Sequence, residues 1–461
     1  MRRALARAAR AIDGERRARG VAIDARARAT TTTRTRTRDD GDGGRARARA
    51  LATTPSREDD GRRGEIAIDR SGLRRALEGR ARAGDAREEG TRGGLLGHLE
   101  RAMKFAGGSI PVSEYVRECL THPEYGYYMR DADVFGKKGD FVTSPEISQV
   151  FGELIGVWAA LQYEALGSPD TLRIVEFGPG RGTLMADLLR GTRKFAKFRD
   201  AVSVHLIEVS PALRKTQAKT LRCGELETTA AEGNARFVSE INDAEVFWHD
   251  GLESVPRGPT LVICHEFFDA LPVRQFQRTE RGWCEKLITI DSEKADSLRL
   301  IELSPPSMTL WDALVDRIEK NSGAVLAIDY GEEGPLGNTL EAIKDHKFVH
   351  VLDSPGEADL SAYVDFGALR QIVEEKPQSG VKCYGPVTQQ QLLLSLGLVP
   401  RLEKLVENAS SEAQADELVQ GCERLVGDGA GDPESGVAPG MGSRYKAIAM
   451  VSRGLPKPVG F

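Results

Sequence analysis

Three glycines and one acidic residue follow a short apolar run in this chain. The run spans residues 172–175, and after it come Glu176, Gly178, Gly180 and Gly182. The run is typical of a buried parallel strand, and the apolar residues after Gly182 recur at helical spacing. A glycine-rich turn between a strand and a helix lets a ligand approach the backbone closely. The pattern therefore predicts a ligand-binding turn, with an ordinary tight turn as the alternative.

The spacing of these glycines distinguishes two classes of cofactor. Turns that bind dinucleotides have the pattern G-x-G-x-x-G, which would indicate a nicotinamide-dependent oxidoreductase. Here the pattern is E-x-G-x-G-x-G over residues 176–182. This form resembles the cofactor loop of class I S-adenosylmethionine-dependent methyltransferases, and it disfavours the nicotinamide alternative.

Acidic residues also follow the next two predicted strands. Glu208 stands about 20 to 30 residues beyond the glycines, where a carboxylate can accept hydrogen bonds from a ribose diol. It could instead cap the helix that begins near Ser210. Asp250 follows the strand predicted at 245–248, where an adenine amine would need an acceptor; the alternative is a solvent-exposed turn residue.

A histidine and two acids follow the fourth predicted strand, 260–264. They are His265, Glu266 and Asp269, with two phenylalanines between the acids. Ligands bind beyond the carboxyl ends of such strands, and carboxylates are the bidentate partners of a guanidinium group. The two acids could equally stabilise the N-terminus of a following helix. From these residues alone both interpretations stay open.

The candidate residues lie together only if strands and helices alternate around them. Apolar runs predict strands at 172–176, 203–208, 245–248, 260–264 and 324–328, with helices between them and a last strand at 444–451. This alternation is typical of a parallel, doubly wound α/β sheet, so we expect a Rossmann-like methyltransferase domain at 169–455. Strand-like stretches on both sides of a Glu-Arg-Gly turn predict an inserted β-hairpin at about 273–303.

The segment before the glycine turn, residues 93–168, is expected to be a helical addition to this sheet. Its first part has amphipathic spacing, and Pro145 suits the first turn of a later helix. Thr143 or Ser144 would cap that helix. Apolar residues continue the helical pattern through Trp158.

Residues 1–92 differ in composition from the rest of the chain. They contain no Phe, Trp, Tyr or Lys and carry 25 Arg against 15 acidic residues. So few large apolar groups do not offset the entropy of ordering, and we expect a disordered segment. The first 38 residues, with twelve Arg and three acids, resemble a mitochondrial transit peptide followed by a linker. A plastid address and an arginine-rich arm without targeting function are the alternatives.

The remaining residues carry 39 basic against 54 acidic side chains, a net charge of 39 − 54 = −15. This excess of acids argues against nucleic acid as a partner, since that affinity rests on neutralising phosphates. The six cysteines form no C-x-x-C pair, and His346 and His350 lie in a strand-like stretch, so no metal is expected. No apolar run is long enough for a membrane span.

Several longer motifs resemble the MidA family, which includes the arginine methyltransferases of mitochondrial complex I assembly. They are EYGYY at 124–128, GDFVTSPEISQVFGE at 139–153, EFGPGRG at 176–182, HEFFDALPV at 265–273, AIDYG at 327–331, ADLSAYVDF at 358–366 and MGSRYK at 441–446. The resemblance covers residues 95–452 approximately and leaves out 1–92. His265 stands where bacterial members often have Asn, and residues 428–440 look longer than is usual in the family.

The resemblance implies a class I methyltransferase of the mitochondrial matrix with S-adenosylmethionine as its cofactor. It implies symmetric dimethylation (type II activity) of an arginine in a core subunit of complex I near the quinone site, early in assembly. It leaves the oligomeric state open. An alternative is a non-catalytic assembly chaperone that binds the cofactor only for structure.

The resemblance and the strand positions together assign roles to the candidate residues. The segment 176–182 would hold the methionine end of the cofactor, Glu208 its ribose and Asp250 its adenine. Glu266 and Asp269, with His265 beside them, would be the catalytic residues that meet the arginine. The motif at 139–153 places Thr143, Ser144 and Glu146 near the substrate or the cofactor.

Overall fold

The computed structural model describes most of the chain after its arginine-rich beginning. The described residues are 94–130, 142–223, 236–280, 282–289, 300–334, 337–429 and 440–461. The predicted transit peptide and linker at 1–92, and most of the loop at 428–440, lie outside them. Among the described helices, none has both the length and the apolar character that crossing a membrane requires.

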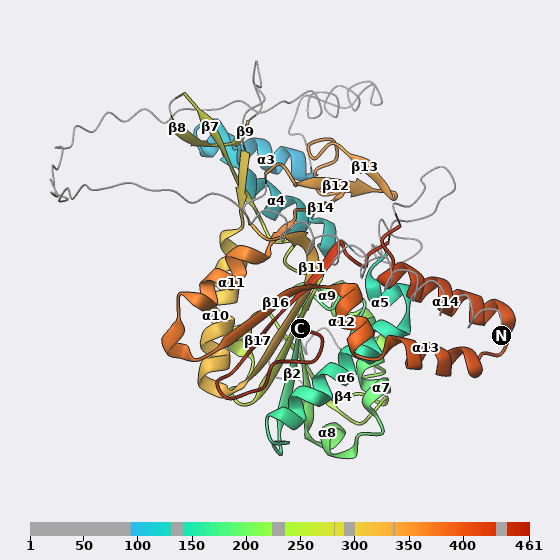
Figure 1. The fold of residues 1–461 in the computed structure, drawn as a ribbon. Helices are drawn as coiled ribbons and strands as arrows, with labels where there is room; N and C mark the ends of the chain where they lie inside the picture. Colours follow the sequence, from blue (N-terminus) through green and yellow to red (C-terminus); the bar gives the residue numbers. More distant parts are fainter. Residues whose placement is uncertain are drawn as a thin grey trace, which may run out of the picture.

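A nine-stranded sheet forms the centre of the molecule (Figure 1). Its order is β16-β17-β11-β6-β2-β3-β5-β4, and β15 pairs with β11 outside this path. The strands are β2 (Leu172–Phe177), β3 (Val202–Ile207), β4 (Phe237–Val238), β5 (Glu245–His249), β6 (Thr260–His265), β11 (Gly323–Glu332), β15 (Val364–Asp365), β16 (Lys382–Thr388) and β17 (Tyr445–Val451).

The central strands β11, β6, β2, β3 and β5 are parallel to their neighbours, whereas β17 is antiparallel to both β11 and β16. Strand β6 is buried along its whole length and β11 nearly so. Parallel strands covered on both faces are expected to be apolar throughout, and these are the runs from which the strands were predicted. The arrangement confirms the predicted Rossmann-like class.

The sheet reverses its direction of growth at β2. From β2 the chain adds β3 and then β5 on one side, and it crosses to β6 and β11 on the other. In open α/β sheets the crevice at such a reversal, beyond the carboxyl ends of the strands, is where ligands bind. The glycine turn at 178–182 follows β2 directly and therefore opens into this crevice.

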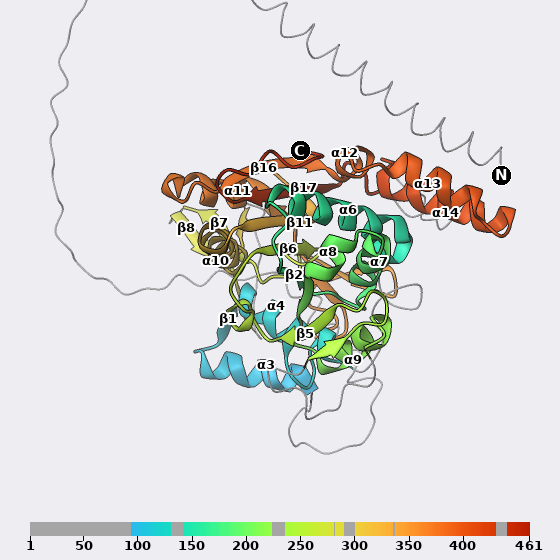
Figure 2. The same ribbon diagram turned by 90° about the horizontal axis from the view of Figure 1, so that it is seen from below.

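Helices cover both faces of the sheet (Figure 2). Neighbouring residues such as Leu261 and Val262 belong to two different apolar cores, because successive side chains of a strand point to opposite faces. One core includes side chains of α6, α7, α12, α13 and α14, and the other those of α10 and α11. The helices are α6 (Gln149–Ala165), α7 (Thr183–Thr192), α8 (Ala196–Ala201), α9 (Pro211–Thr220), α10 (Pro305–Asn321), α11 (Phe366–Glu374), α12 (Gln389–Ser395), α13 (Leu398–Glu407) and α14 (Glu412–Val426), with 3-10 turns η1 (Tyr127–Met129), η3 (Leu252–Ser254) and η4 (Pro377–Ser379).

The segment predicted as one helix through Trp158 is two helices, and Thr143 is the N-cap residue of the first, as predicted. A short helix, α5 (Ser144–Ile147), ends at Ser148, whose backbone is extended. The Ser148 Oγ atom accepts a hydrogen bond from the Val150 backbone N at 3.3 Å and so caps α6. The Thr143 side chain makes no cap hydrogen bond. The break at Ser148 separates α5 from α6 and leaves Ser144 in reach of the loop that follows β6.

A smaller lobe, called here the upper lobe, lies above the sheet in Figure 1. Its core includes Leu99, Tyr115, Ile288 and Leu360, which come from widely separated segments. The elements are α3 (Gly94–Phe105), β1 (Ser109–Pro111), α4 (Val112–Thr121), β9 (Leu287–Thr289), β12 (Glu341–Lys344), β13 (Lys347–Val349) and β14 (Asp359–Ser361). The first part of the segment predicted as a helical addition therefore shares one core with later parts of the chain, whereas α6 packs in a core of the central sheet.

The predicted insertion contains the expected hairpin and more. Strands β7 (Arg274–Thr279) and β8 (Gly282–Glu285) pair antiparallel, and β10 (Leu300–Leu303) adds a third strand beside β7. Strand β9 pairs with β1 of the upper lobe instead.

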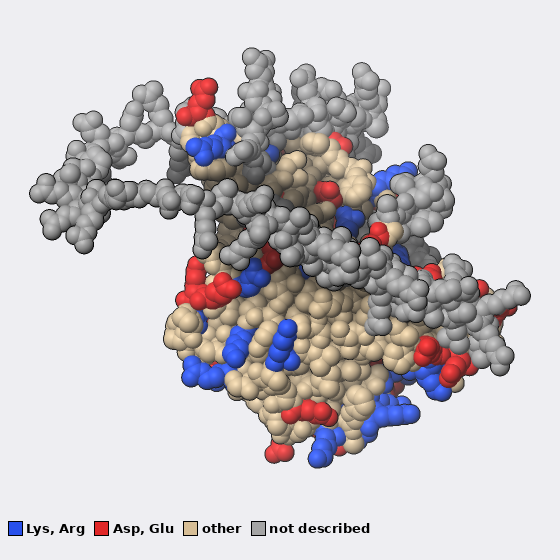
Figure 3. Space-filling view, viewed as in Figure 1, with Lys and Arg blue, Asp and Glu red and all other residues tan. Residues whose placement is uncertain are grey.

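On the face of the molecule shown in Figure 3, basic and acidic side chains of the described residues are interspersed.

Candidate active site

A cavity of about 1660 Å³ lies beyond the carboxyl ends of the central strands. Loops after β2, β3, β5 and β6 line it from below, and residues of the upper lobe, among them Tyr128 and Asp359, line it from above. Ten of the twelve residues predicted for the site line this cavity: Thr143, Glu146, Glu176, Gly178, Gly180, Glu208, Asp250, His265, Glu266 and Asp269. The other two, Ser144 and Gly182, are not among its lining residues.

The glycine turn has a backbone that other residues adopt with strain. Gly178 has a φ of +56°, and Gly182, at the start of α7, has a φ of +82°. A Cβ atom on Gly178 would stand 2.8 Å from Cδ2 of Phe267, in the loop that follows β6. Real Cβ atoms do not come that close, so glycine is required here for two reasons. The turn and the β6 loop thus pack against each other without a side chain between them.

Glu176 ends the first strand as a buried carboxyl group. It is 3% exposed, and its Oε2 atom has no hydrogen-bond partner among the described residues. Burial without a compensating charge raises the pKa of Glu176 to about 8. An unpaired buried carboxyl oxygen beside a ligand-binding turn fits a ligand that brings its own donor, such as an ammonium group.

Glu208 is held by the first residues of α9 without being the cap of that helix. Its Oε1 accepts from the Ser210 backbone N at 2.8 Å, and its Oε2 accepts from Gln217 Nε2 at 3.1 Å. The helix cap is Ser210, whose Oγ accepts from the Leu213 backbone N. Gln217 Nε2 also donates to the Gly180 carbonyl oxygen at 2.8 Å, which ties Glu208 to the glycine turn. The capping interpretation of Glu208 is therefore wrong.

Asp250 lies at the outer end of the same region. Its side chain is 82% exposed, and Arg214 Nη2 stands 2.5 Å from its Oδ1. Arg214 Nε donates to the Glu208 carbonyl oxygen at 2.7 Å, so one guanidinium spans both acidic positions. Asp250 is thus solvent-exposed, as one interpretation held, and it lines the cavity as the other required.

The two acids after β6 stand in a turn and not at the start of a helix. The chain passes through this turn directly into β7, so the alternative in which Glu266 and Asp269 stabilise a helix N-terminus is wrong. Glu266 has a φ of +47°, a conformation that costs a non-glycine residue of order 1–3 kcal/mol and that clusters at functional sites. His265 Nε2 lies 3.2 Å from Glu266 Oε1.

Glu266 presents one oxygen to the protein and the other to the cavity side. Its Oε1 accepts from the backbone N and the Oγ of Ser144, at 3.1 Å and 3.3 Å. No described residue donates to its Oε2. Glu146, two residues beyond Ser144, accepts a 2.5 Å hydrogen bond from Thr183 Oγ1 at the start of α7. Helix α5 therefore connects the loop that carries Glu266 and Asp269, called here the acidic loop, to the start of α7 beside the glycine turn. Thr143, Ser144 and Glu146 thus lie between these two parts of the site.

Asp329 organises the turn that carries both acids, and the sequence reasoning missed it. It is fully buried at the carboxyl end of β11. Its Oδ2 accepts from the backbone N atoms of Phe267, Phe268 and Asp269, at 3.2, 3.0 and 3.3 Å. Burial, with Glu266 close by, raises its pKa to about 7. The sequence did contain a signal for Asp329. It directly follows the apolar run 324–328, and the position of an acid at the end of a predicted strand was the reason for choosing Glu176 and Glu208.

Carboxyl groups gather where the loop after β6 lines the cavity. Burial, followed by the charges of Asp329, Asp359 and Glu266, raises the pKa of Asp269 well above its usual range. Asp359 accepts a 2.7 Å hydrogen bond from the hydroxyl of Tyr128, and both line the cavity from the upper lobe. A cation that enters relieves the repulsion among these groups, so the arrangement favours a positively charged ligand.

A group of potential metal ligands lies in the upper lobe, outside this cavity. His98, Glu118 and His122 bring ligand atoms within 4.8 Å of one another. His122 Nδ1 already accepts from the backbone N atoms of Glu124 and Tyr125, at 3.2 and 3.3 Å. These two hydrogen bonds hold the backbone that follows His122.

Comparison with known proteins gives the family. A family described as putative S-adenosyl-L-methionine-dependent methyltransferases matches residues 154–301 and 297–387. The protein arginine methyltransferase NDUFAF7, mitochondrial, of Xenopus tropicalis is 38% identical over 398 residues, covering 80% of this chain and 89% of that protein. Its Drosophila melanogaster homologue is 39% identical over 387 residues, covering 77% and 85%.

A solved structure shares the fold. The crystal structure of a likely methyl transferase from Burkholderia thailandensis, bound to S-adenosyl-homocysteine, superposes with a TM-score of 0.62 at 24% identity and covers 86% of this chain and 97% of its own. The matches confirm the resemblance drawn from the motifs and the expected cofactor, S-adenosyl-L-methionine. The chain belongs to the family of S-adenosyl-L-methionine-dependent methyltransferases that includes the mitochondrial NDUFAF7 proteins.

Proposed function

We propose that this protein transfers a methyl group from S-adenosylmethionine to the side chain of an arginine in a protein. One observation carries the proposal: Glu266 and Asp269 line the same cavity as the glycine turn and Glu208. Donor and acceptor sites that open into one cavity can bring the two reactants into contact. The relatives whose names say protein arginine methyltransferase support the choice of arginine.

The cofactor would lie along the crevice with its three parts on three strand ends. Glu176 and the glycine turn would take the methionine part, Glu208 the ribose hydroxyls and Asp250 the adenine amine. The unpaired Oε2 of Glu176 fits the cofactor's ammonium group, because that group would supply the missing donor. The bound cofactor supplies a methyl group on a positively charged sulfur, and the chain's residues hold and align what reacts with it.

The acids after β6 would hold the guanidinium for attack. A carboxylate that accepts N–H bonds from two guanidinium nitrogens fixes the plane of the group and directs the third toward the donor. Glu266 Oε2, to which no described residue donates, would accept the proton that the arginine nitrogen loses when it takes the methyl group. Asp329 would act by position, because it fixes the backbone from which both acids project.

The finer proposal is symmetric dimethylation of a core complex I subunit near the quinone site, in the mitochondrial matrix. It rests on the family resemblance. Mass spectrometry of complex I from cells with and without this protein tests it. We expect a symmetric dimethylarginine that disappears with the protein and returns with the wild-type chain. Asymmetric or single methylation, or an unchanged spectrum, would contradict it. Assembly restored by a variant that binds the cofactor without methylating would favour the chaperone alternative.

Proton release tests the place given to Glu176. In the free protein burial raises the pKa of Glu176 to about 8, so the group is mostly protonated at pH 7. An ammonium group beside it favours the carboxylate, so cofactor binding at pH 7 should release up to about one proton. Affinity should then rise with pH toward 8. Calorimetry in buffers of different ionisation enthalpy measures the release. Glu176→Gln should release fewer protons, whereas equal release by both proteins would contradict the assignment.

The same shift predicts a dependence of stability on pH. Between its unfolded pKa near 4.5 and its folded value of about 8, Glu176 holds a proton in the folded protein and not in the unfolded chain. The proton bound by Glu176 stabilises the folded state at low pH. The free energy of unfolding of the cofactor-free protein should therefore fall as pH rises from about 4.5 to about 8. Glu176→Gln should flatten this part of the stability profile.

Targeting by the N-terminal segment is tested by a fusion. Residues 1–92 joined to a fluorescent protein should be delivered to mitochondria, because the first 38 residues are rich in arginine and poor in acids. Microscopy with a matrix marker gives the result. Diffuse cytosolic fluorescence would contradict a transit peptide. Delivery to plastids would confirm a transit peptide but contradict the mitochondrial destination.

A further inference from the structure

Arg424 lines the cavity without a side-chain partner among the described residues. It lies on α14, and its guanidinium makes no hydrogen bond or ion pair with any residue that the structure describes. Its Nε atom is buried. The residue as a whole is half-buried, and a buried N–H of a charged guanidinium is destabilising unless an anion or acceptor meets it. The position therefore calls for an anionic partner from outside the described residues.

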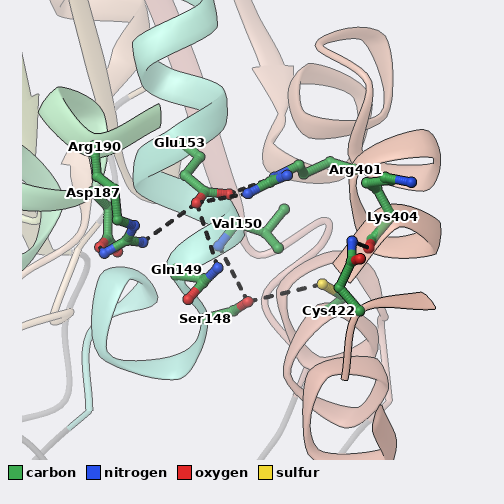
Figure 4. A network of polar contacts seen from close by, with 10 residues as sticks. Ser148, Gln149, Val150, Glu153, Asp187, Arg190, Arg401, Lys404 and Cys422 are labelled. Atoms are coloured by element: carbon green, nitrogen blue, oxygen red, sulfur yellow. Dashed lines mark hydrogen bonds and ion pairs between the residues drawn. The ribbon is translucent and has the colours of Figure 1, made fainter. Parts of the chain in front are cut away.

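Helix α14 is brought to the cavity by contacts with α5 and α6, which Figure 4 shows from close by. Glu153 of α6 is buried, and its Oε2 and Oε1 accept from Arg401 Nε and Nη2, at 2.7 Å and 3.0 Å. Arg401 belongs to α13, the helix before α14. Ser148 Oγ lies 3.9 Å from Cys422 Sγ. A Cβ atom on Gly421 would stand 3.0 Å from the Ile147 carbonyl oxygen, so the absence of a side chain lets α14 approach α5.

These contacts place Arg424 on the side of the cavity that holds the glycine turn and the acidic loop. Helix α5, against which α14 packs, contacts Glu266 through Ser144 and Thr183 through Glu146. Burial lowers the pKa of Arg424, and among the described residues Tyr445 and Glu266 oppose this shift. The ribose and adenine positions follow β3 and β5, on the other side of β2.

We propose that Arg424 binds the carboxylate of the cofactor's methionine part. That carboxylate is the one anionic group of S-adenosylmethionine, and a guanidinium matches it with two parallel hydrogen bonds. The other guanidinium groups that line the cavity have partners: Arg181 lies 3.6 Å from Glu146, and Arg444 lies over the ring of Tyr330. The inference rests on the cofactor of the family and not on the identity of the acceptor. A carboxylate of the acceptor protein is the other source of the same chemistry.

The test compares two ligands that differ only in this carboxylate. Calorimetry would measure the affinity of S-adenosylmethionine and of decarboxylated S-adenosylmethionine for the wild-type protein, for Arg424→Gln and for Arg193→Gln, a control on the exposed surface. We expect wild type and control to prefer the carboxylate-bearing ligand by about 10- to 100-fold. Arg424→Gln should lose this preference while its affinity for the decarboxylated ligand stays within about twofold. Arg424→Lys should show an intermediate preference for the carboxylate-bearing ligand. Lysine keeps the positive charge but lacks the two parallel N–H donors of the guanidinium.

Four results would overturn the assignment. The first is a wild-type protein that binds both ligands equally, which needs no variant to fold. The second is a folded Arg424→Gln, with an unchanged melting temperature, that keeps the preference. The third is an Arg424→Gln variant with unchanged cofactor affinity and a raised KM for the acceptor protein. Arg424 would then bind a carboxylate of the acceptor protein and not that of the cofactor. Equal loss of affinity for both ligands with a lower melting temperature would show a structural role instead.

Discussion

Glu266→Gln is expected to lower methyl transfer by about 10- to 100-fold while S-adenosylmethionine binds close to normally. The amide keeps the size of the side chain, and its oxygen can still accept from Ser144, which holds Glu266 Oε1 at 3.1 Å and 3.3 Å. In the glutamine an NH2 group would replace Oε2, to which no described residue donates. It would be a hydrogen-bond donor at the place where a guanidinium needs an acceptor. A charge-assisted hydrogen bond contributes about 1.5–3 kcal/mol, which gives this range of rates if it acts in the transition state.

Two further variants sharpen this experiment. Glu253→Gln is the matched control, because Glu253 also lines the cavity but is exposed on the far side, near Asp250. It should methylate normally. Asp269→Asn should lose less activity than Glu266→Gln, since burial and its acidic neighbours raise the pKa of Asp269 and so disfavour its charged form. Full turnover by a folded Glu266→Gln would remove this residue from the catalytic group.

Gly178→Val is expected to abolish cofactor binding, with the fold retained. A side chain at φ +56° is strained, and its Cβ would stand 2.8 Å from the ring of Phe267. Either the turn moves out of the crevice or the loop with Glu266 moves away from it, and both change the cofactor site. Strain of order 1–3 kcal/mol together with the clash with Phe267 is enough to displace one of the two segments, so binding of the cofactor should no longer be detected.

The control for this substitution has the same backbone penalty at a distant place. Gly167, which follows the C-terminal end of α6, has a φ of +83°, and its Cβ would meet nothing within 4 Å. Gly167→Val should lower the melting temperature modestly and bind the cofactor normally by calorimetry. Near-normal affinity of a folded Gly178→Val would contradict the placement of the ligand at this turn.

The sheet and most of its acidic rim could be predicted because each depends on neighbours in the sequence. Glu176, Glu208 and Glu266 each follow an apolar run directly, and the carboxyl ends of parallel strands meet at one edge. Asp329 could have been found by the same rule. The break between α5 and α6 could not, because Ser148 becomes a cap only through its backbone geometry. Arg424 gave no signal, since its place depends on the packing of α14 against a helix far away in the chain.

The upper lobe has a core whose parts are made at very different times during synthesis. Leu99 of α3 and Leu120 of α4 pack with Ile288 of β9 and Leu360 of β14. Closing such long loops is slow compared with forming local contacts. The apolar faces of α3 and α4 must therefore stay uncovered until β14 has left the ribosome, and they are exposed to aggregation meanwhile. A chain truncated before β14 would lose the support for its own N-terminal helices, and with Asp359 the roof of the cavity.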